Sequence, residues 1–318
     1  MDPRLREIEL REDEVEKLVS NILGIPWGGT STNASPFIGG DMSILVRLHK
    51  KNIQFINSEY YFKEKSIIHF TNLQSAFSIL GTNKIRLYNL YKKNDEKEFI
   101  YASEILKEFC KPTESYFYDY EEEINAVRFN TFILSATIKD NIKDFWGKDY
   151  SSNGNGVGFE FSFFHNPDKW EGFYLSPVKY GYPDKIFKLH DDLLKLQDKH
   201  KNIDYKINLN QLIPFYKEQK WSDENEIRLM TFYPQEYKLE TYHDENDENI
   251  KCINLPLLSN EFNKDTFTVT TIPFLKIEKI YIGSQVEKSV IDKIKKTIEK
   301  NYFNEIQIIP TLPIEVHI

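Results

Sequence analysis

Residues 221–229 read Trp-Ser-Asp-Glu-Asn-Glu-Ile-Arg-Leu and combine strand-forming apolar residues with charged side chains. If this stretch is extended, successive side chains point to opposite faces of a sheet. One face then carries three charges: Glu224, Glu226 and Arg228. The other face carries Asn225, Ile227 and Leu229. Such a charged face is either a solvated sheet surface or the wall of a polar cleft.

Strands and helices are predicted on both sides of this stretch. Residues 131–138, Thr-Phe-Ile-Leu-Ser-Ala-Thr-Ile, are short, apolar and β-branched, which is typical of a buried strand. A strand is also predicted over 66–71, and a helix begins after Asn72. The glycine-rich turn at 153–156 opens another strand over 157–161.

The second half of the chain continues this mixed order. The predicted elements are a helix over 184–219, an acidic loop over 240–249, strands over 267–272, 277–283 and 306–309, and a helix over 286–300. Strands outnumber helices in the middle of the chain, and no regular βαβ alternation is present. The order predicts an α+β fold around a mixed, mainly antiparallel sheet with flanking helices.

The first 60 residues differ from the rest. Residues 4–23 have the apolar spacing of an amphipathic helix, which ends at Gly24 and Pro26. The loop predicted over 27–36 contains glycines, but no Gly-Lys-Ser/Thr follows them, so it is not a phosphate-binding loop. We therefore expect an N-terminal accessory segment over 1–60 and one main domain over 61–318.

Composition limits the classes of protein that fit. The chain has 318 residues, 40% hydrophobic and 28% charged, which is typical of a globular protein. Its formal net charge is −8, so a general electrostatic attraction to nucleic acid or to an anionic membrane is not predicted, although a local basic groove remains open. Cys110 and Cys252 lie in no metal-ligand spacing, and no apolar run is long enough to span a membrane. A cytoplasmic protein is expected.

Three segments place polar side chains inside otherwise apolar strands: His69-x-Thr71, Ser135-x-Thr137 and Glu224-x-Glu226. A buried strand that carries polar groups must pair them internally or present them to a ligand. Internal pairing is an open alternative for each segment. Taken in this order, however, the segments resemble the sites of the ADP-ribosyltransferase superfamily.

From about residue 66 to residue 300 the chain also resembles a bacterial family, domain of unknown function 2971, which has been suspected of belonging to the same superfamily. The resemblance rests on His69-Phe70-Thr71, Asn94-Asp95 with Glu98, the strand of Ser135, Phe145-Trp146 with Tyr150, Gly156-x-Gly158-x-Glu160, Lys220-Trp221-x-x-Glu224-x-Glu226-x-Arg228 and the strand Ile280–Gly283. Phe70 replaces a more frequent Tyr, and Asn94-Asp95 lacks the usual following proline. The first 60 residues lie outside the resemblance.

The resemblance implies an ADP-ribosyltransferase-like domain over 61–318, with a sheet core of that type. It also implies an enzyme that cleaves the nicotinamide–ribose bond of NAD and modifies a macromolecular acceptor, in a bacterial toxin or anti-phage defence context. Glu226 would stabilise the oxocarbenium-like state and hold the ribose 2′-hydroxyl, as carboxylates do in glycoside hydrolysis. Glu224 would orient or deprotonate the acceptor. His69 would bind the nucleotide ribose with support from Thr71.

The remaining candidates would bind the nucleotide. Ser135 would line its site, and Trp146, Tyr150 or Trp221 would stack on the nicotinamide or on an acceptor base. Arg228 would pair with a pyrophosphate oxygen or, as a structural ion pair, with Glu226 or Glu160. Protein, nucleic acid and free nucleotide all remain open as acceptors, and residues 1–60 are a candidate surface for a protein partner.

Other classes fit the sequence less well. No HxH or HExxH motif is present, so no metal is predicted, and no G-x-S-x-G motif indicates a serine nucleophile. The second hypothesis is a non-catalytic module of a bacterial defence or toxin system, which would bind a nucleotide or a partner protein in the same cleft.

Overall fold

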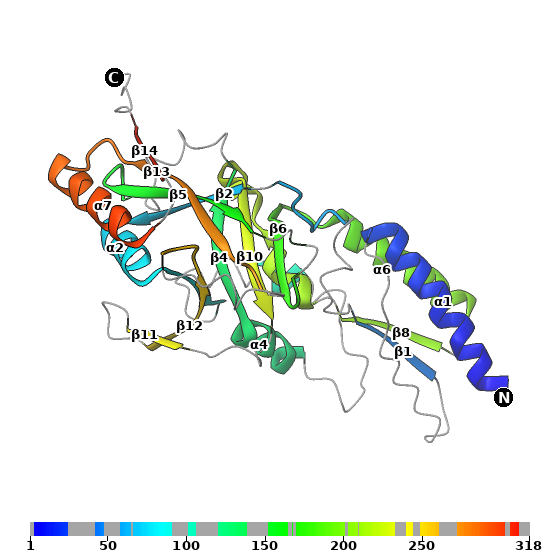
Figure 1. Ribbon diagram of the computed structural model, residues 1–318. Coiled ribbons are helices and arrows are strands. Elements are labelled where there is room, and N and C mark those ends of the chain that lie inside the picture. The colour runs from blue at the N-terminus through cyan, green and yellow to red at the C-terminus, as the bar shows by residue number, and fades with distance from the viewer. Residues whose placement is uncertain are drawn as a thin grey trace, which may run out of the picture.

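The computed structural model describes residues 3–24, 42–47, 58–64, 66–90, 101–105, 120–138, 152–164, 167, 170–200, 203–208, 210–232, 240–243, 249–260, 272–302 and 306–311. Within them the chain forms a mixed α+β structure around a large, mainly antiparallel sheet (Figure 1). This confirms the fold class expected from the sequence. Four predictions fall wholly or mainly outside these residues: the loop at 27–36, the Asn94-Asp95 motif, the motif of Phe145-Trp146 with Tyr150, and the strand at 267–272.

The large sheet branches at β4. Its strands are β2 (Ser66–Asn72), β3 (Lys84–Asn89), β4 (Thr131–Thr137), β5 (Gly156–Phe163), β6 (Phe173–Pro177), β10 (Glu226–Phe232), β11 (Glu240–His243), β12 (Asn249–Pro256), β13 (Leu275–Ile282) and β14 (Gln307–Pro310). They follow the order β11-β12-β3-β4-β2-β5-β13-β14, and β10 pairs with β4 and β6. Strand β3 meets β4 at Ile133, whereas β2 meets it at Thr137.

Strand β10 lies between two hydrophobic cores. All of its residues are buried, and it pairs with β4 along its whole length, from Glu226 opposite Thr137 to Phe232 opposite Thr131. Ile227 and Leu229 pack into the core that contains residues of α2 (Leu73–Thr82) and α7 (Lys288–Asn301). Met230 and Phe232 pack into the other core. Because side chains alternate along the strand, the two sets of residues point to opposite faces of the sheet and pack into different cores.

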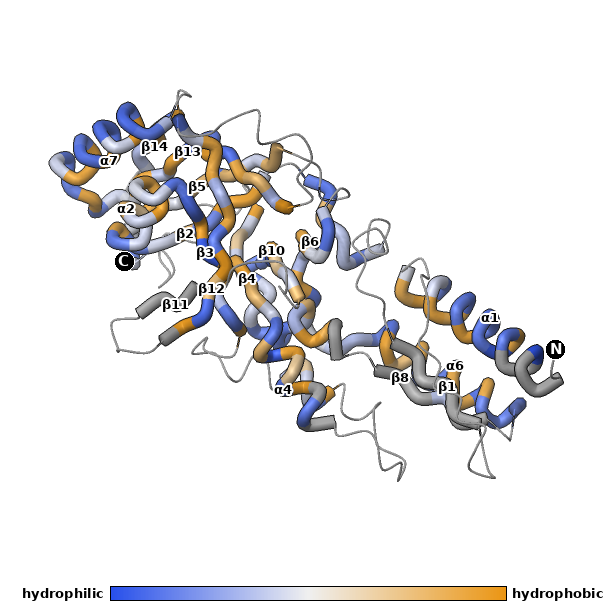
Figure 2. Tube along the Cα trace, turned by 60° about the horizontal axis from the view of Figure 1, so that its bottom comes forward, coloured by the Kyte–Doolittle hydropathy of each residue, from blue (hydrophilic) through white to orange (hydrophobic). Residues whose placement is uncertain are grey.

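The N-terminal segment packs against the middle of the chain. Helix α1 (Pro3–Leu23) contacts α6 (Asp184–Lys199), and β1 (Met42–Arg47) pairs in parallel with β8 (Ile203–Asn208). Figure 1 shows these four elements together, at the end of the molecule farthest from α7. Hydrophobic and hydrophilic positions alternate along α1, as expected of an amphipathic helix (Figure 2). Its apolar residues share one core with those of α6.

A side-chain hydrogen bond marks one end of each of two helices, α4 (Tyr120–Asn130) and α2. Helix α4 precedes β4 directly, and Thr131 at their junction donates its hydroxyl to the Val127 carbonyl at 2.6 Å. Helix α2 begins as the sequence predicts, because the Asn72 side chain accepts a hydrogen bond from the Ser75 amide at 2.8 Å. No helix among the described residues is long and apolar enough to cross a membrane.

Two expectations for the second half of the chain are wrong. The helix predicted over 184–219 ends at Lys199, and β8, the 3₁₀ helix η6 (Asn210–Phe215) and β9 (Tyr216–Lys217) follow it. Pro214 cannot continue an α-helical ladder, which explains part of this difference. The acidic stretch predicted as a loop begins with β11, which pairs with β12.

The stretch at 221–229 is extended only in its second half. Residues Gln219–Glu224 form the 3₁₀ helix η7, and Asn225 adopts a left-handed conformation with φ 42°. Strand β10 begins at Glu226. Serine, aspartate and asparagine compete with regular structure through local side-chain hydrogen bonds, and asparagine tolerates φ > 0, so the Ser-Asp-Glu-Asn run suits a turn. Glu224 therefore reaches its position from a turn and not from the strand.

Candidate functional site

Four buried charged side chains meet at the start of β10. They are Lys217, Glu224, Glu226 and Arg228, with exposed fractions of 5, 5, 6 and 2%. Arg228 binds Glu226 with two hydrogen bonds, from Nε to Oε1 at 2.9 Å and from Nη2 to Oε2 at 3.0 Å. The Lys217 ammonium donates to Glu224 Oε2 at 2.6 Å and to Glu226 Oε2 at 3.3 Å. Two cations thus face two carboxylates, and we call these four residues the charged network.

The turn before β10 brings Glu224 to this network. The left-handed Asn225 reverses the chain between η7 and the strand. Thr137 on β4 fixes this reversal, because its hydroxyl lies 3.2 Å from the Glu224 carbonyl oxygen and 3.3 Å from that of Asn225. Arg228 is anchored at its far end by a hydrogen bond from Nη1 to the Pro214 carbonyl at 2.5 Å. Backbone groups therefore hold the network from two sides.

A small two-stranded sheet positions Lys217 beside the two carboxylates of the network. Strands β7 (Lys179–Tyr180) and β9 pair in parallel, with Tyr180 opposite Lys217. The Glu226 amide donates to the Tyr180 hydroxyl at 2.8 Å. Burial raises the pKa of the Tyr180 phenol above its ordinary value, and the nearby Glu226 and Glu224 carboxylates add to the shift, against the lowering effect of the amide hydrogen bond. The phenol therefore stays neutral beside the network.

Trp221 is the exposed aromatic residue beside the network. Its side chain is 38% exposed. The Lys217 ammonium lies 5.4 Å from the centre of the indole ring, and the Lys220 ammonium lies 5.5 Å from it. Such distances allow cation–π attraction. Lys217 thus contacts an exposed ring as well as the two buried carboxylates.

The register places the second polar motif beside the network. Glu226 lies opposite Thr137 and Arg228 lies opposite Ser135 across β10 and β4. Residues that pair across two strands share a face of the sheet. Ser135 and Thr137 therefore lie on the same face of the sheet as Glu226 and Arg228.

The first polar motif lies on the opposite face. Ile68 pairs with Thr137 and so shares the face of Glu226. His69 and Thr71 alternate with Ile68 along β2 and point to the other side. His69 Nδ1 donates to the Ser135 carbonyl oxygen at 2.8 Å. His69 and Thr71 therefore do not share the face of Glu226, and the imidazole instead links β2 to β4 where these strands separate.

Residues 146–229 match the family model described as Protein of unknown function (DUF2971). The expected resemblance to this family is confirmed for this segment, which is shorter than the range of 66–300 inferred from the sequence. No curated protein and no solved structure matches the chain. The DUF2971 segment contains the whole charged network and Tyr180, and it ends one residue after Arg228.

The DUF2971 segment also contains Trp146 and Tyr150, which lie outside the described residues. The structural ion pair expected for Arg228 is confirmed, with Glu226 as its partner. Sequence reasoning missed Tyr180 because it lies in a segment distant from the Glu224-x-Glu226 motif, and it missed Lys217 because this residue reaches the network from β9 and not from the motif itself. Among the residues that the structure describes, no group of three His, Cys, Asp or Glu side chains is placed to hold a metal ion.

Proposed function

We propose that this protein cleaves the nicotinamide–ribose bond of NAD and transfers ADP-ribose to a macromolecular acceptor, as an ADP-ribosyltransferase-like enzyme. The charged network in the DUF2971 segment is the observation that carries the proposal. Replacing a buried ion-pair network by apolar residues is often neutral or stabilising, so such a network is weak support for stability. Clusters of buried ionisable groups are concentrated at functional sites. We therefore assign a catalytic role to the network.

Glu226 is the residue that we place beside the reacting ribose. When the bond between ribose C1′ and the pyridinium nitrogen breaks, its electron pair leaves with nicotinamide and C1′ becomes an oxocarbenium-like cation. A carboxylate stabilises this cation and accepts a hydrogen bond from the 2′-hydroxyl. Among the described residues, three donor contacts occupy the roughly four acceptor positions of the Glu226 carboxylate. One position on Oε1 is then left for a ribose hydroxyl.

Glu224 takes the role of general base in this proposal. The acceptor attacks C1′ and loses its proton to the Glu224 carboxylate. Lys217, 2.6 Å from Glu224 and 3.3 Å from Glu226, holds the two carboxylates near each other. Arg228 fixes the Glu226 carboxylate through its bidentate contact, which makes it a positioning residue.

The flat ring that such a substrate needs is available at Trp221, which would stack on the nicotinamide or on an acceptor base. Ser135, opposite Arg228, remains a candidate for binding the nucleotide. His69 and Thr71 have no place in this site, because their side chains point to the other face of the sheet. Trp146 and Tyr150 keep the stacking role implied by the family resemblance.

Incubation of the full chain with nicotinamide-labelled and adenylate-labelled NAD in total cell lysate tests this proposal. We expect nicotinamide release and labelling of an acceptor by the wild type, and loss of both in Glu226→Gln. Asp223→Asn is the matched control, because Asp223 is an exposed carboxylate in the same turn. Glu226→Gln also weakens a buried ion pair, so folding is checked by circular dichroism, and Glu224→Gln serves as a second variant. Equal activity in a folded Glu226→Gln variant would remove Glu226 from the mechanism.

One observation favours the second candidate, a nucleotide- or partner-binding module without catalysis. Both carboxylates of the network already have cationic partners, as in a closed structural network. In that case neither wild type nor variant releases nicotinamide, and nucleotide or partner binding is measurable without turnover. The NAD experiment separates the two candidates.

A further inference from the structure

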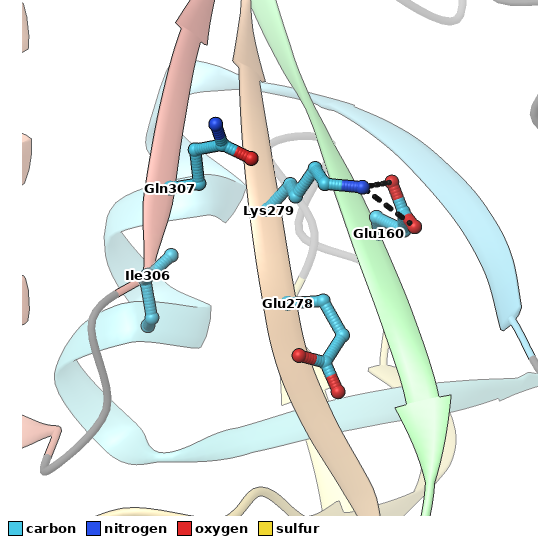
Figure 3. Close-up of a pocket in the computed structure, with 5 residues that line it drawn as sticks. All are labelled: Glu160, Glu278, Lys279, Ile306 and Gln307. Carbon is cyan, nitrogen blue, oxygen red and sulfur yellow. Dashed lines mark hydrogen bonds and ion pairs between the residues drawn. The ribbon is translucent and has the colours of Figure 1, made fainter.

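A polar hollow lies on the large sheet at the end that β14 forms. It has a volume of about 740 Å³ and lies over β5, β13 and β14. Its lining residues are Glu160, Glu278, Lys279, Ile306 and Gln307 (Figure 3). This volume is within the range of small-molecule sites, roughly 300–1,000 Å³.

A β-bulge supplies two of the lining residues. The register of β13 against β5 shifts between Ile277 and Lys279, so that Glu278 is the extra residue. In a regular strand Glu278 and Lys279 would point to opposite faces, but here both line the hollow. Bulges interrupt a ladder of hydrogen bonds and commonly redirect a side chain next to a functional site. The bulge thus gives the hollow a polar group that a regular strand would direct away.

Hydrogen bonds hold both carboxylates of the hollow. The Tyr281 hydroxyl donates to Glu160 Oε2 at 2.6 Å, and the Lys279 ammonium lies 3.2 Å from each oxygen of Glu160. Ser162 donates to Glu278 Oε1 at 2.5 Å, and Lys276 donates to its two oxygens at 3.0 and 2.8 Å. Each carboxylate is fixed before a ligand arrives, which reduces the entropy cost of binding.

The charges of the hollow select the chemistry of the ligand. The two carboxylates are each paired with a lysine, Glu160 with Lys279 of the lining and Glu278 with Lys276 beside it, so neither an anion nor a cation gains a net attraction there. A hydroxyl group both donates and accepts, so it can bind a carboxylate and an ammonium or amide at once. Vicinal hydroxyls suit a surface on which acceptors and donors alternate, as Glu160, Lys279 and Gln307 do across β5, β13 and β14.

We propose that this hollow binds a neutral, hydroxyl-rich small molecule, either a free sugar or the ribose of a nucleoside. Its hydroxyls donate to Glu160 and Glu278 and accept from Lys279 and the Gln307 amide. The site goes beyond the proposed NAD chemistry and does not depend on it. Glu226 and Glu160 lie on one face but are separated by three strand spacings, about 14 Å. Thr137 and Ile68, which lie between them, are 0 and 1% exposed, so buried residues separate the two sites along the sheet.

Saturation-transfer NMR on the full chain tests the site with D-ribose, D-glucose and adenosine as neutral probes, and with spermidine and citrate as charged probes. We expect at least one neutral probe to bind, with a Kd in the millimolar range. Glu278→Gln replaces one acceptor oxygen by a donor, and Gln307→Leu removes the amide, so each should weaken binding by about tenfold. A free sugar is indicated if D-ribose or D-glucose binds as well as adenosine, and a nucleoside if adenosine binds better.

Glu287→Gln is the control, because Glu287 is an exposed carboxylate at the start of α7. It should bind the probe like the wild type. Gln307 is exposed, so its replacement is not expected to disturb folding, which circular dichroism checks. The proposal is overturned if no neutral probe binds, if spermidine or citrate binds in preference, or if both hollow variants keep the wild-type affinity.

Discussion

Replacing Lys217 by methionine is the sharpest test of the charged network. Methionine keeps an unbranched side chain of similar length but removes the ammonium that contacts both Glu224 and Glu226. Arg228 then faces two carboxylates alone. The side chain of Lys217 is 6% exposed, so water cannot replace the lost donor without a rearrangement.

The expected cost follows from this burial. Removing one partner of a buried ion pair typically destabilises a protein by about 3–5 kcal/mol, because the other charge is left buried and uncompensated. A domain is stable by only about 5–15 kcal/mol, so this change removes a large part of the total. A second substitution, Glu224→Gln, removes the excess negative charge and should restore at least about 1 kcal/mol in the double variant.

Urea unfolding followed by circular dichroism measures these effects, provided that the m-value stays constant among the variants. Lys220→Met is the control, because the Lys220 side chain is 59% exposed and its loss should change stability by less than about 0.5 kcal/mol. If Lys217→Met lies within about 0.5 kcal/mol of the wild type, the network does not bury its charges as we describe. An additive double variant would show that Lys217 and Glu224 do not interact.

Two further predictions concern other parts of the sheet. Burial raises the pKa of Glu278, but hydrogen bonds from Lys276 and Ser162 outweigh it and bring the pKa below its ordinary value of 4.5. The stabilisation that the ionised Glu278 carboxylate gives the folded protein is therefore complete above that pH and is lost as the pH falls through the folded pKa. Below pH 4.5 the free energy of unfolding of Glu278→Gln should therefore fall less steeply than that of the wild type, which acid titrations measure. In Gly283→Ala a Cβ would lie 2.1 Å from the Gly154 carbonyl oxygen, whereas at Gly81 nothing lies within 4 Å. Thermal unfolding should show a loss of about 3 kcal/mol or more for Gly283→Ala and none for Gly81→Ala; equal values would contradict the close packing.

The strands were predictable where apolar periodicity and burial agree. Residues 131–138 were identified by composition alone, because a strand between two others is apolar on both faces, and β4 has such neighbours. Helix α2 was recognised by the helical spacing of its apolar residues after Asn72, and β5 by the glycine-rich turn before it. These signals are local, and the fold class follows from their order along the chain.

The site was less predictable because it depends on register and on one turn. Alternation correctly placed Glu226 and Arg228 on one face, but Glu224 arrives there from the left-handed turn at Asn225. Whether His69 shares that face depends on the pairing of Ile68 with Thr137, and a register shift of one residue would reverse it. Lys217 reaches the charged network because β9 pairs with β7, and no local sequence pattern indicates this pairing.

These pairings show that the DUF2971 segment does not build the site alone. Strand β10 takes one neighbour, β6, from inside the segment, but β4 with Ser135 and Thr137 comes from outside it. Helix α6 lies inside the segment, yet α1 covers its apolar face, so residues before the segment complete that core. A fragment limited to 146–229 would expose both the edge of β10 and the face of α6, and such surfaces promote aggregation. Both the charged network and its chemistry must therefore be tested in the full chain, where β4 supplies the Thr137 hydroxyl that fixes the turn at Glu224 and Asn225.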